Sequence, residues 1–452
     1  LLLGKLTSPP GQHIELVVMF HYFRVGAGVL AIVASYDFLC LFVGKTRWRR
    51  WGVVLASLGG GLGWALVLLG QGDWLGSLPL DFYSPETFGF LALYGLPHLA
   101  LARALLLWGL RAYLRPDLIP HPRWAGWITG ALWLLMGLMQ PLTILIGWAV
   151  IGSYLILLLG VQLWGRWKEG HADWESWFPW LWRTIQAGLV SAPLVGYTAW
   201  AFGTDPVLKQ WTAQNLLPSP PPGHYLVAYG LLLPAAFIVV WQLIKAGPSF
   251  RWLLVSWSFL FPVLIYIPFP FQRRLAEGYW VALIALVIIA LEMVPERVSK
   301  RLQGLLALTL PTTLLLFVGG VQVARQPAKP VFRPTEEVAA FRFLAEETHG
   351  EAVVLASYET GNALPAWAPV FIVLGHGPES VGLSDLRPEV ERFYQAETPD
   401  EDRMALLDAY DVDYVFWGPA ERALGDWNPH EDINLQVVHE QDGYAVFMVS
   451  KE

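Results

Sequence analysis

The sequence is poor in the side chains that build disulfides and zinc sites. Cys40 is the one cysteine among 452 residues, so the chain can form no internal disulfide, CxxC redox pair or cysteine zinc cluster. Its ten histidines include no HExxH pair or comparable ligand spacing. Charged residues make up only 15% of the chain. The composition therefore indicates neither zinc chemistry nor an ordinary soluble globular protein.

Apolar residues dominate instead. They account for 55% of the chain, which includes 24 tryptophans. A helix needs roughly 20 apolar residues to cross a hydrocarbon core of about 30 Å. Ten runs approach this length, at residues 15–43, 52–70, 88–110, 124–140, 142–164, 181–202, 225–245, 251–268, 277–294 and 303–323. The fourth and fifth runs meet at Gln140 and Pro141, so they are either two spans or one broken or re-entrant pair. We predict a mostly α-helical, polytopic transmembrane bundle of about ten spans.

The distribution of charge predicts the orientation of these spans. From Thr335 onward the chain has 24 acidic and 6 basic residues, a balance of −18, which leaves about +11 on residues 1–334. Lysine and arginine gather in alternate loops such as 44–50 (GKTRWRR), which marks those loops as cytoplasmic. The loop at 71–88 has acidic residues and no base. This loop and the acidic tail are therefore predicted to be extracytoplasmic, in a protein of a prokaryotic plasma membrane.

The tail, residues 335–452, has the pattern of a small α/β domain that follows the transmembrane domain at 1–334. A helix is predicted at 336–348, and buried strands in AVVLAS, VFIVL and VDYVFWG. One or two helices at 388–410 and a closing hairpin at 433–449 complete the domain. Its negative charge argues against binding to nucleic acid or to an anionic membrane surface. The domain is either a lid or scaffold for the membrane part, or a ligand-binding domain whose loops follow the strands.

Two adjacent arginines, Arg273 and Arg274, interrupt the apolar sequence at 268–280 (PFPFQRRLAEGYW). The loop alternation places them on the external side, against the usual preference of basic residues for the cytoplasm. They could simply reach the lipid headgroups, or pair with Glu277. The alternative is that they bind a phosphate of a substrate, because guanidinium groups hold phosphate through two hydrogen bonds and stay charged. Their position at the membrane edge suits a lipid-linked phosphate.

Four further polar residues lie inside apolar runs. His21 and Arg24 are about one helical turn apart, near the external end of the first run, so they share a helix face. They either look into an external cavity or make internal and headgroup contacts. His98 follows Pro97 and suits a hydrogen-bonded histidine of the bundle better than a catalytic one. Arg103 lies nearer the cytoplasmic end of its run, and we expect it to reach toward that surface.

The overall layout resembles the GT-C superfamily of membrane glycosyltransferases, which includes protein mannosyltransferases dependent on dolichyl-phosphate-mannose and aminoarabinose transferases. The likeness covers residues 14–323, and QRRLAEGYW stands where the family places an arginine that holds the phosphate of a polyprenyl-phosphate sugar. The segment LLDAYDVDYVFWGPAER, 406–422, is similar to a C-terminal signature of bacterial membrane proteins of this kind. The resemblance implies that Gln272, Arg273 and Arg274 bind the donor phosphate.

The sequence departs from the family pattern at the catalytic acid. Members of the family usually have this acid in a D-x-D or D-E arrangement, in the first external loop after a first transmembrane helix. Here LLLGKLTSPPGQH resembles the end of that loop, so we expect the main acid upstream of Leu1, in a sequence that is incomplete at its N-terminus. Within the chain, Asp81 or Glu86 of DFYSPE could serve as the base or hold a divalent cation, Mg²⁺ or Mn²⁺. Acidic residues of an external loop are also often only solvated.

These features predict a glycosyltransferase. Sugar transfer from a polyprenyl-phosphate donor needs a base for the acceptor hydroxyl and positive charge for the departing phosphate. The acceptor would be a lipid, glycan or protein at the external face, and membrane lipids and protein partners would accompany the donor. The alternative is a non-catalytic scaffold subunit of similar fold in a larger complex. A transporter is less favoured, because the sequence has no evident inverted repeat and no paired intramembrane carboxylates.

Overall fold

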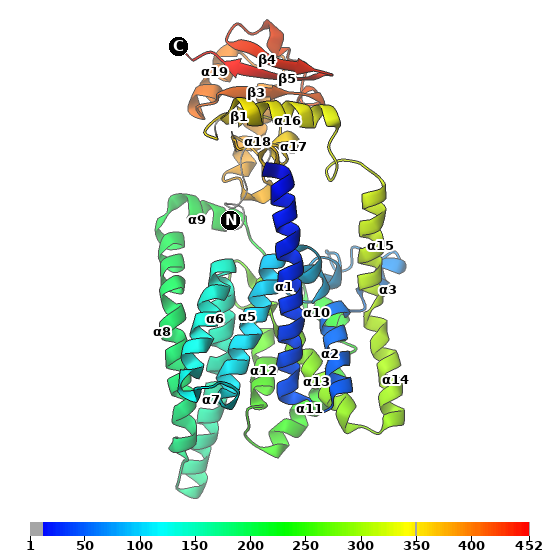
Figure 1. The fold of residues 1–452 in the computed structure, drawn as a ribbon, viewed down its shortest axis with the longest axis vertical. Coiled ribbons are helices and arrows are strands. Elements are labelled where there is room, and N and C mark those ends of the chain that lie inside the picture. The colour runs from blue at the N-terminus through cyan, green and yellow to red at the C-terminus, as the bar shows by residue number, and fades with distance from the viewer. Residues whose placement is uncertain (1–11, 349, 452) are drawn as a thin grey trace. The chain divides into compact units, whose positions relative to one another are not determined.

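The computed structural model describes residues 12–348 and 350–451 (Figure 1). This part of the chain is mostly helical, with one five-stranded sheet near the C-terminus. It divides into two compact units. We call residues 23–203 and 216–321 the helical unit, and the described residues of 1–22, 204–215 and 322–452 the sheet unit. The prediction of a helical bundle followed by a small α/β domain is confirmed at this level.

Helices occupy each of the ten apolar runs. Their bounds are α1 (Gln12–Phe42), α2 (Thr46–Leu58), α3 (Gly63–Leu68), α4 (Phe90–Gly95), α5 (Pro97–Leu114), α6 (Ala125–Met139), α7 (Leu142–Glu169), α8 (Trp174–Thr204), α10 (Pro222–Tyr229), α11 (Leu233–Ala246), α12 (Trp252–Tyr266), α13 (Tyr279–Met293), α14 (Glu296–Leu306) and α15 (Pro311–Arg325). The fourth and fifth runs are two separate helices, α6 and α7, which break at Gln140 and Pro141 and pack against each other.

The number of helices that are long and apolar enough to span a membrane is smaller than the number of predicted runs. Four qualify among the described residues, at Glu15–Phe42, Leu142–Lys168, Gln272–Met293 and Glu296–Arg325. A fifth span results if α10 and α11, which meet at 86°, count as one. The count of ten is not confirmed by this criterion. One reason is that two predicted runs are broken: the second between α2 and α3, and the third before Pro97, where α4 gives way to α5.

Helix α13 forms the centre of the helical unit. Its sequence, YWVALIALVIIALEM, is apolar on every face, and such a helix is stable when neighbours surround it. Nearly all of its side chains are buried, and it packs against α2, α11 and α12. Its one indole N–H, on Trp280, donates to the carbonyl of Ala56 at 3.1 Å. The residues that precede α13 are therefore attached to a helix that neighbours surround on every side.

The sheet unit contains the α/β domain expected from the tail. Its elements are α9 (Pro206–Gln214), α16 (Thr335–Glu347), β1 (Val353–Leu355), α17 (Tyr358–Gly361), β2 (Phe371–Ile372), α18 (Leu383–Phe393), α19 (Asp400–Ala409), β3 (Tyr414–Trp417), α20 (Pro419–Arg422), β4 (Leu435–Gln441) and β5 (Tyr444–Val449). The strand order is β2-β1-β3-β5-β4, with β1 parallel to β2 and β3, and β5 antiparallel to β3 and β4. Strand β4 therefore forms one edge.

The predicted closing hairpin is confirmed. Strands β4 and β5 are joined by Asp442 and Gly443, whose φ angles are +49° and +82°. A two-residue turn of this kind needs positive φ at both positions, which Asp and Gly tolerate. Helix α16 covers one face of the sheet, where Phe341 packs near Phe416 and Val446. The opposite face packs against α18 and α19.

Candidate functional site

Arg273 and Arg274 lie on a short 3-10 helix, η5 (Gln272–Ala276), which directly precedes α13. The chain turns into α13 at Gly278, whose φ of +83° falls in the left-handed region that glycine adopts without strain. A Cβ at this position would meet the Leu106 side chain at 2.7 Å. The turn therefore requires glycine, and it fixes the two arginines at the N-terminal end of the central helix.

Arg273 lines an open groove of about 520 Å³, which we call the Arg273 groove. Its guanidinium lies over the ring of Tyr83, 4.8 Å from the ring centre. Its Nε is buried and has no hydrogen-bond partner among the described residues. The other lining residues are mostly apolar: Leu75, Gly76, Ser77, Leu78, Leu216, Leu217, Pro218, Ser219, Pro220 and Pro221. The groove thus combines apolar walls with one positive charge.

Gln272 holds one wall of this groove in place. Its Oε1 accepts from the Ser219 backbone N–H at 3.1 Å, and its Nε2 donates to the Ile267 carbonyl at 2.8 Å. The backbone N–H of Arg273 also donates to the Leu217 carbonyl, at 3.2 Å. Both ends of the Gln272 amide are therefore engaged with the backbone, so this side chain shapes the groove wall that the Leu217 and Ser219 segment forms.

Arg274 has different neighbours from those of Arg273. Its Nε lies 3.9 Å from Oε1 of Glu86, and its guanidinium is 5.5 Å from the Phe271 ring centre. Glu86 is 4% exposed, and its Oε2 has no hydrogen-bond partner within the described part of the chain. His98, the second residue of α5, is exposed and within electrostatic range of both Arg274 and Glu86. The structure therefore brings three of the predicted site residues together.

Arg103 and Glu277 form a buried ion pair, which corrects two expectations. Arg103 Nε donates to Glu277 Oε1 at 2.5 Å, and Nη2 donates to Oε2 at 3.0 Å. The guanidinium also donates to the carbonyls of Phe88 at 2.9 Å and Pro85 at 2.8 Å. Arg103 therefore does not reach a membrane surface. A buried carboxylate without a partner would cost several kcal/mol, and the guanidinium of Arg103 removes this cost by pairing with Glu277. Glu277 is accordingly the partner of Arg103, not of the adjacent arginines.

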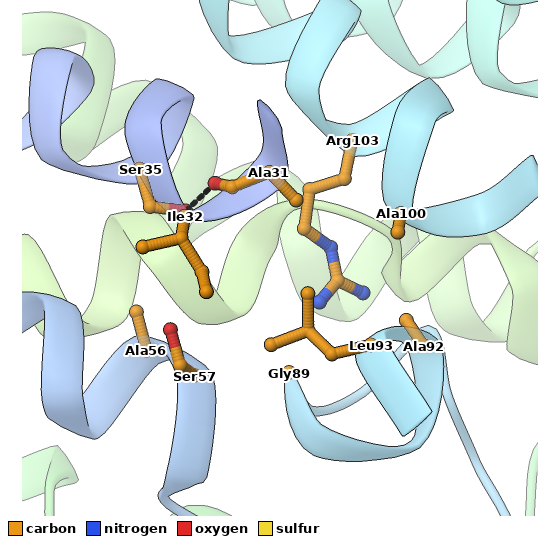
Figure 2. Close-up of a pocket in the computed structure, with 10 residues that line it drawn as sticks. All are labelled: Ala31, Ile32, Ser35, Ala56, Ser57, Gly89, Ala92, Leu93, Ala100 and Arg103. Carbon is orange, nitrogen blue, oxygen red and sulfur yellow. Dashed lines mark hydrogen bonds between the residues drawn. The ribbon is translucent and has the colours of Figure 1, made fainter. Parts of the chain in front are cut away.

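A small cavity adjoins this ion pair (Figure 2). Its volume is about 10 Å³, and the Arg103 side chain projects along it. The remaining lining residues are small or apolar: Ala31, Ile32, Ser35, Ala56, Ser57, Gly89, Ala92, Leu93 and Ala100. Such a volume holds one water molecule at most. The cavity is therefore a packing gap at the junction of helices and not a substrate site.

Asp81 is an anchor between helices. Its Oδ2 accepts from the Gly63 backbone N–H at 3.1 Å and from the Thr312 hydroxyl at 2.6 Å. Asp81 is 3% exposed, and burial raises the pKa of this carboxyl above its usual range. A Cβ on residue 63 would lie 2.0 Å from Oδ1, so glycine is needed for the close approach. These contacts connect the start of α3 to the start of α15.

Two solved structures share the overall fold of this chain. An oligosaccharyltransferase from Archaeoglobus fulgidus, in complex with Zn and sulfate, superposes with a TM-score of 0.52 at 13% identity, over 88% of this chain and 56% of that chain. AglB from the same organism, in complex with an inhibitory peptide and a dolichol-phosphate, gives 0.51 at 12% identity, over 88% and 58%. The chain has the GT-C fold. It spans less than two thirds of the length of those chains.

ArnT from Cupriavidus metallidurans, bound to undecaprenyl phosphate, gives a TM-score of 0.49 at 13% identity, over 95% of this chain and 84% of that chain. No family model matches the sequence, and no curated protein is similar to it. The predicted resemblance is confirmed for the fold, by the two oligosaccharyltransferase structures, and sequence similarity does not contribute to it.

The predicted divalent-cation ligands do not form a metal site within the described residues. No group of three or more His, Cys, Asp or Glu side chains is placed there to hold an ion. Asp81 already accepts two hydrogen bonds, and Glu86 faces the positive charge of Arg274. These two carboxylates do not fit the donor set that Mg²⁺ or Mn²⁺ requires. No step is therefore assigned to a metal.

His21 and Arg24 share helix α1, as predicted, but their contacts differ. The His21 ring meets the Phe20 ring edge-on at 5.5 Å. Arg24 Nη1 donates to the Tyr94 carbonyl at 2.9 Å, near the end of α4. Arg24 therefore satisfies a backbone acceptor at a helix end, and a role for either residue in a site stays a prediction.

Sequence reasoning missed Tyr83 and assigned Arg103 the wrong contacts. Tyr83 stands inside the quoted DFYSPE segment, between the two candidate carboxylates, and its ring faces Arg273. Arg103 could have been found from the need of a buried charge for a partner, because Glu277 is the acidic residue at the start of the ninth apolar run. No pattern in the sequence connects Tyr83 to Arg273, since this contact arises from the packing of distant segments.

Proposed function

We propose that the chain is a membrane glycosyltransferase that moves a sugar from a polyprenyl-phosphate donor to a lipid, glycan or protein acceptor at the external face of the membrane. The observation that supports this most directly is the Arg273 groove. It offers apolar walls and one guanidinium that stays charged at any relevant pH. A polyprenyl phosphate has the complementary chemistry, an apolar chain that ends in an anion.

In this proposal Arg273 binds the donor phosphate. Its Nε, buried and unpartnered in the described structure, gains an acceptor when a phosphate oxygen is present. The face of the Tyr83 ring stabilises the Arg273 guanidinium through a cation–π contact. Gln272 keeps the wall at Ser219 in place and so assists without contacting the reacting atoms.

Arg274 stabilises the charge that develops on the departing phosphate, and Glu86 orients it. Of the two carboxylates that were candidates for the base, Glu86 is the one placed beside an arginine of the motif, whereas Asp81 is engaged as an anchor. Each carboxylate has one buried oxygen without a partner in the described structure, so the position beside Arg274 decides between them. We therefore propose Glu86 as the carboxylate of this chain that takes part in the reaction. His98 is its neighbour in this cluster.

The GT-C fold supports the same reaction class, because AglB, which shares it, was solved with a dolichol-phosphate. The finer features are also part of the proposal. They are the transfer of a hexose or pentose, a prokaryotic plasma membrane, the ten apolar runs crossing it, and the division into a membrane domain at 1–334 and an extracytoplasmic domain at 335–452.

The test uses undecaprenyl phosphate as the probe and the purified chain in detergent. The change Arg273→Ala removes a charge-assisted interaction of about 1.5–3 kcal/mol, so the Kd should rise on the order of tenfold or more. Arg123→Ala is the matched control, because Arg123 is an exposed arginine at another loop. Equal affinity for the Arg273→Ala variant, the control and the unchanged chain would contradict the assignment. Absence of binding to all three would favour the scaffold alternative.

A further inference from the structure

A second groove lies in the sheet unit, where residues of α16 and of the edge strand β4 line it together. Its volume is about 530 Å³, within the range of sites for small molecules. We call it the α16–β4 groove. Its lining residues are Arg333, Thr335, Val338, Ala339, Arg342, Phe343, Glu346, His439 and Gln441. All of them belong to the sheet unit.

The local structure explains why these side chains meet. The α16 residues recur at intervals of three and four positions from Thr335 to Glu346, which places them on one helix face. A β-bulge in β4 shifts the register between Val437 and His439, and His439 then pairs with Val446, whose side chain packs on the α16 side of the sheet. His439 consequently stacks on Phe343, with ring centres 4.8 Å apart.

This groove gathers basic side chains within an acidic domain. Residues from Thr335 onward sum to −18 with only 6 basic side chains, yet Arg342 and His439 line this groove with Arg333 beside them. Glu346 is the one carboxylate in the lining. Arg342 is exposed, and its guanidinium is 5.9 Å from the Trp367 ring centre. The exposed guanidinium of Arg342 is therefore the group of this groove that attracts an anionic ligand.

Two buried nitrogen atoms of the lining lack partners. The Arg333 side chain is only 8% exposed, and its Nη1 lies 3.3 Å from Glu337 Oε1. Its Nε, which always carries a hydrogen, has no hydrogen-bond partner among the described residues. The same holds for Nε2 of His439. A buried donor without an acceptor costs about 1–3 kcal/mol, so a ligand oxygen placed here would be stabilised.

We propose that the α16–β4 groove binds a small molecule that carries a phosphate or carboxylate group. Arg342 supplies the charge, Arg333 Nε donates a hydrogen bond, and His439 donates a second one in the tautomer that carries its hydrogen on Nε2. The stacked Phe343 ring with Val338 forms the apolar surface for the body of the ligand. A sugar phosphate or a uronic acid has this chemistry. The site is separate from the Arg273 groove, and the inference does not depend on the proposed transfer reaction.

Hydrogen–deuterium exchange of the full chain in detergent tests this proposal at peptide resolution. The probes are potassium phosphate and sodium glucuronate at millimolar concentrations, compared with potassium chloride at equal ionic strength. Occupation of the groove should slow exchange in peptides from α16 and β4 by about threefold or more. The variants Arg342→Ala and His439→Gln should lose this protection. Arg392→Ala is the control, because Arg392 is an exposed arginine of α18 outside the groove.

The two probes show whether the groove prefers a phosphate or a carboxylate. Protection by phosphate, by glucuronate or by both supports the site and identifies the group it prefers. No protection by either probe in the unchanged chain overturns the proposal. Equal protection in the two groove variants and in the Arg392→Ala control also overturns it, because the effect would then come from the salt and not from this groove.

Discussion

Arg103 of α5 and Glu277, which directly follows η5, are 174 residues apart in the sequence and form a buried two-point ion pair in the helical unit. The exposed fraction of the Arg103 side chain is 4% and that of Glu277 is 0%. The same guanidinium holds the carbonyls of Pro85 and Phe88. One side chain therefore ties the segment around Glu86 to the turn that carries the arginine motif.

Removal of one member of this pair should destabilise the protein strongly. Either Arg103→Met or Glu277→Gln leaves a buried group without its partner, and the expected loss is about 3–5 kcal/mol. The midpoint of thermal unfolding in detergent, followed by tryptophan fluorescence, measures it.

The double variant Arg103→Met with Glu277→Leu is the informative control. It removes both charges together, so much of the stability should return, although the carbonyls of Pro85 and Phe88 lose their donor. A double variant as unstable as the single ones would show that the carbonyl contacts, and not the ion pair, account for the loss.

Much of the fold could be predicted because it depends on local patterns. The closing hairpin at Asp442 and Gly443 follows from a two-residue turn signal between alternating strands, and the structure confirms it. The position of Arg273 and Arg274 at the start of a late apolar helix follows from the run that begins at 277. Both features are set by neighbouring residues, so the sequence alone is enough to find them.

The site geometry depends on contacts between distant segments, and these could not be predicted. Tyr83 contacts Arg273 because the segment that follows 80–82 and the groove wall at 216–221 line the same groove as Arg273. The breaks in the second and third apolar runs were also missed. An apolar run of adequate length does not show where a glycine or proline, such as Pro97, will interrupt the helix.

Asp81 should tolerate Asn but not Ala. Asparagine keeps an oxygen that can accept from the Gly63 N–H and the Thr312 hydroxyl, so Asp81→Asn should retain the fold and the binding of undecaprenyl phosphate. Asp81→Ala leaves those two donors without an acceptor, at a cost of about 1–3 kcal/mol. Thermal unfolding of the two variants measures the difference. Loss of sugar transfer in a well-folded Asp81→Asn variant would instead assign Asp81 to the reaction.

The same residue should give the protein a dependence on pH. Burial raises the pKa of Asp81 in the folded chain above its value of about 3.9 in the unfolded chain. The protonated carboxyl therefore contributes its full stabilising free energy when the pH is below the pKa of Asp81 in the unfolded chain. This contribution is lost as the pH rises through the pKa of Asp81 in the folded chain. Because asparagine does not titrate, the stability of Asp81→Asn relative to the unchanged chain should increase from about pH 4 upward. A difference that stays constant with pH would contradict this.

Gly278 should not tolerate a side chain. In Gly278→Ala the methyl group would have to occupy the left-handed region at about 1–2 kcal/mol. It would also lie against Leu106, at a further cost of about 1–3 kcal/mol. Gly304→Ala on α14 is the matched control, because no atom lies within 4 Å of the added Cβ and alanine favours a helix. Thermal unfolding should show a lower midpoint for the first variant only. Equal midpoints would mean that the turn adapts.

Tyr83 should affect the affinity for the donor, and this effect should come from the Tyr83 ring and not from the Tyr83 hydroxyl. The Arg273 guanidinium lies over the ring at 4.8 Å, so Tyr83→Phe keeps the interaction and Tyr83→Leu removes it. A cation–π contact of about 0.5–1 kcal/mol corresponds to a two- to fivefold change in the Kd for undecaprenyl phosphate. Only the leucine variant should show this change. If the phenylalanine variant is equally weakened, the hydroxyl contacts the ligand itself, and if neither variant changes, Arg273 is oriented by the η5 backbone alone.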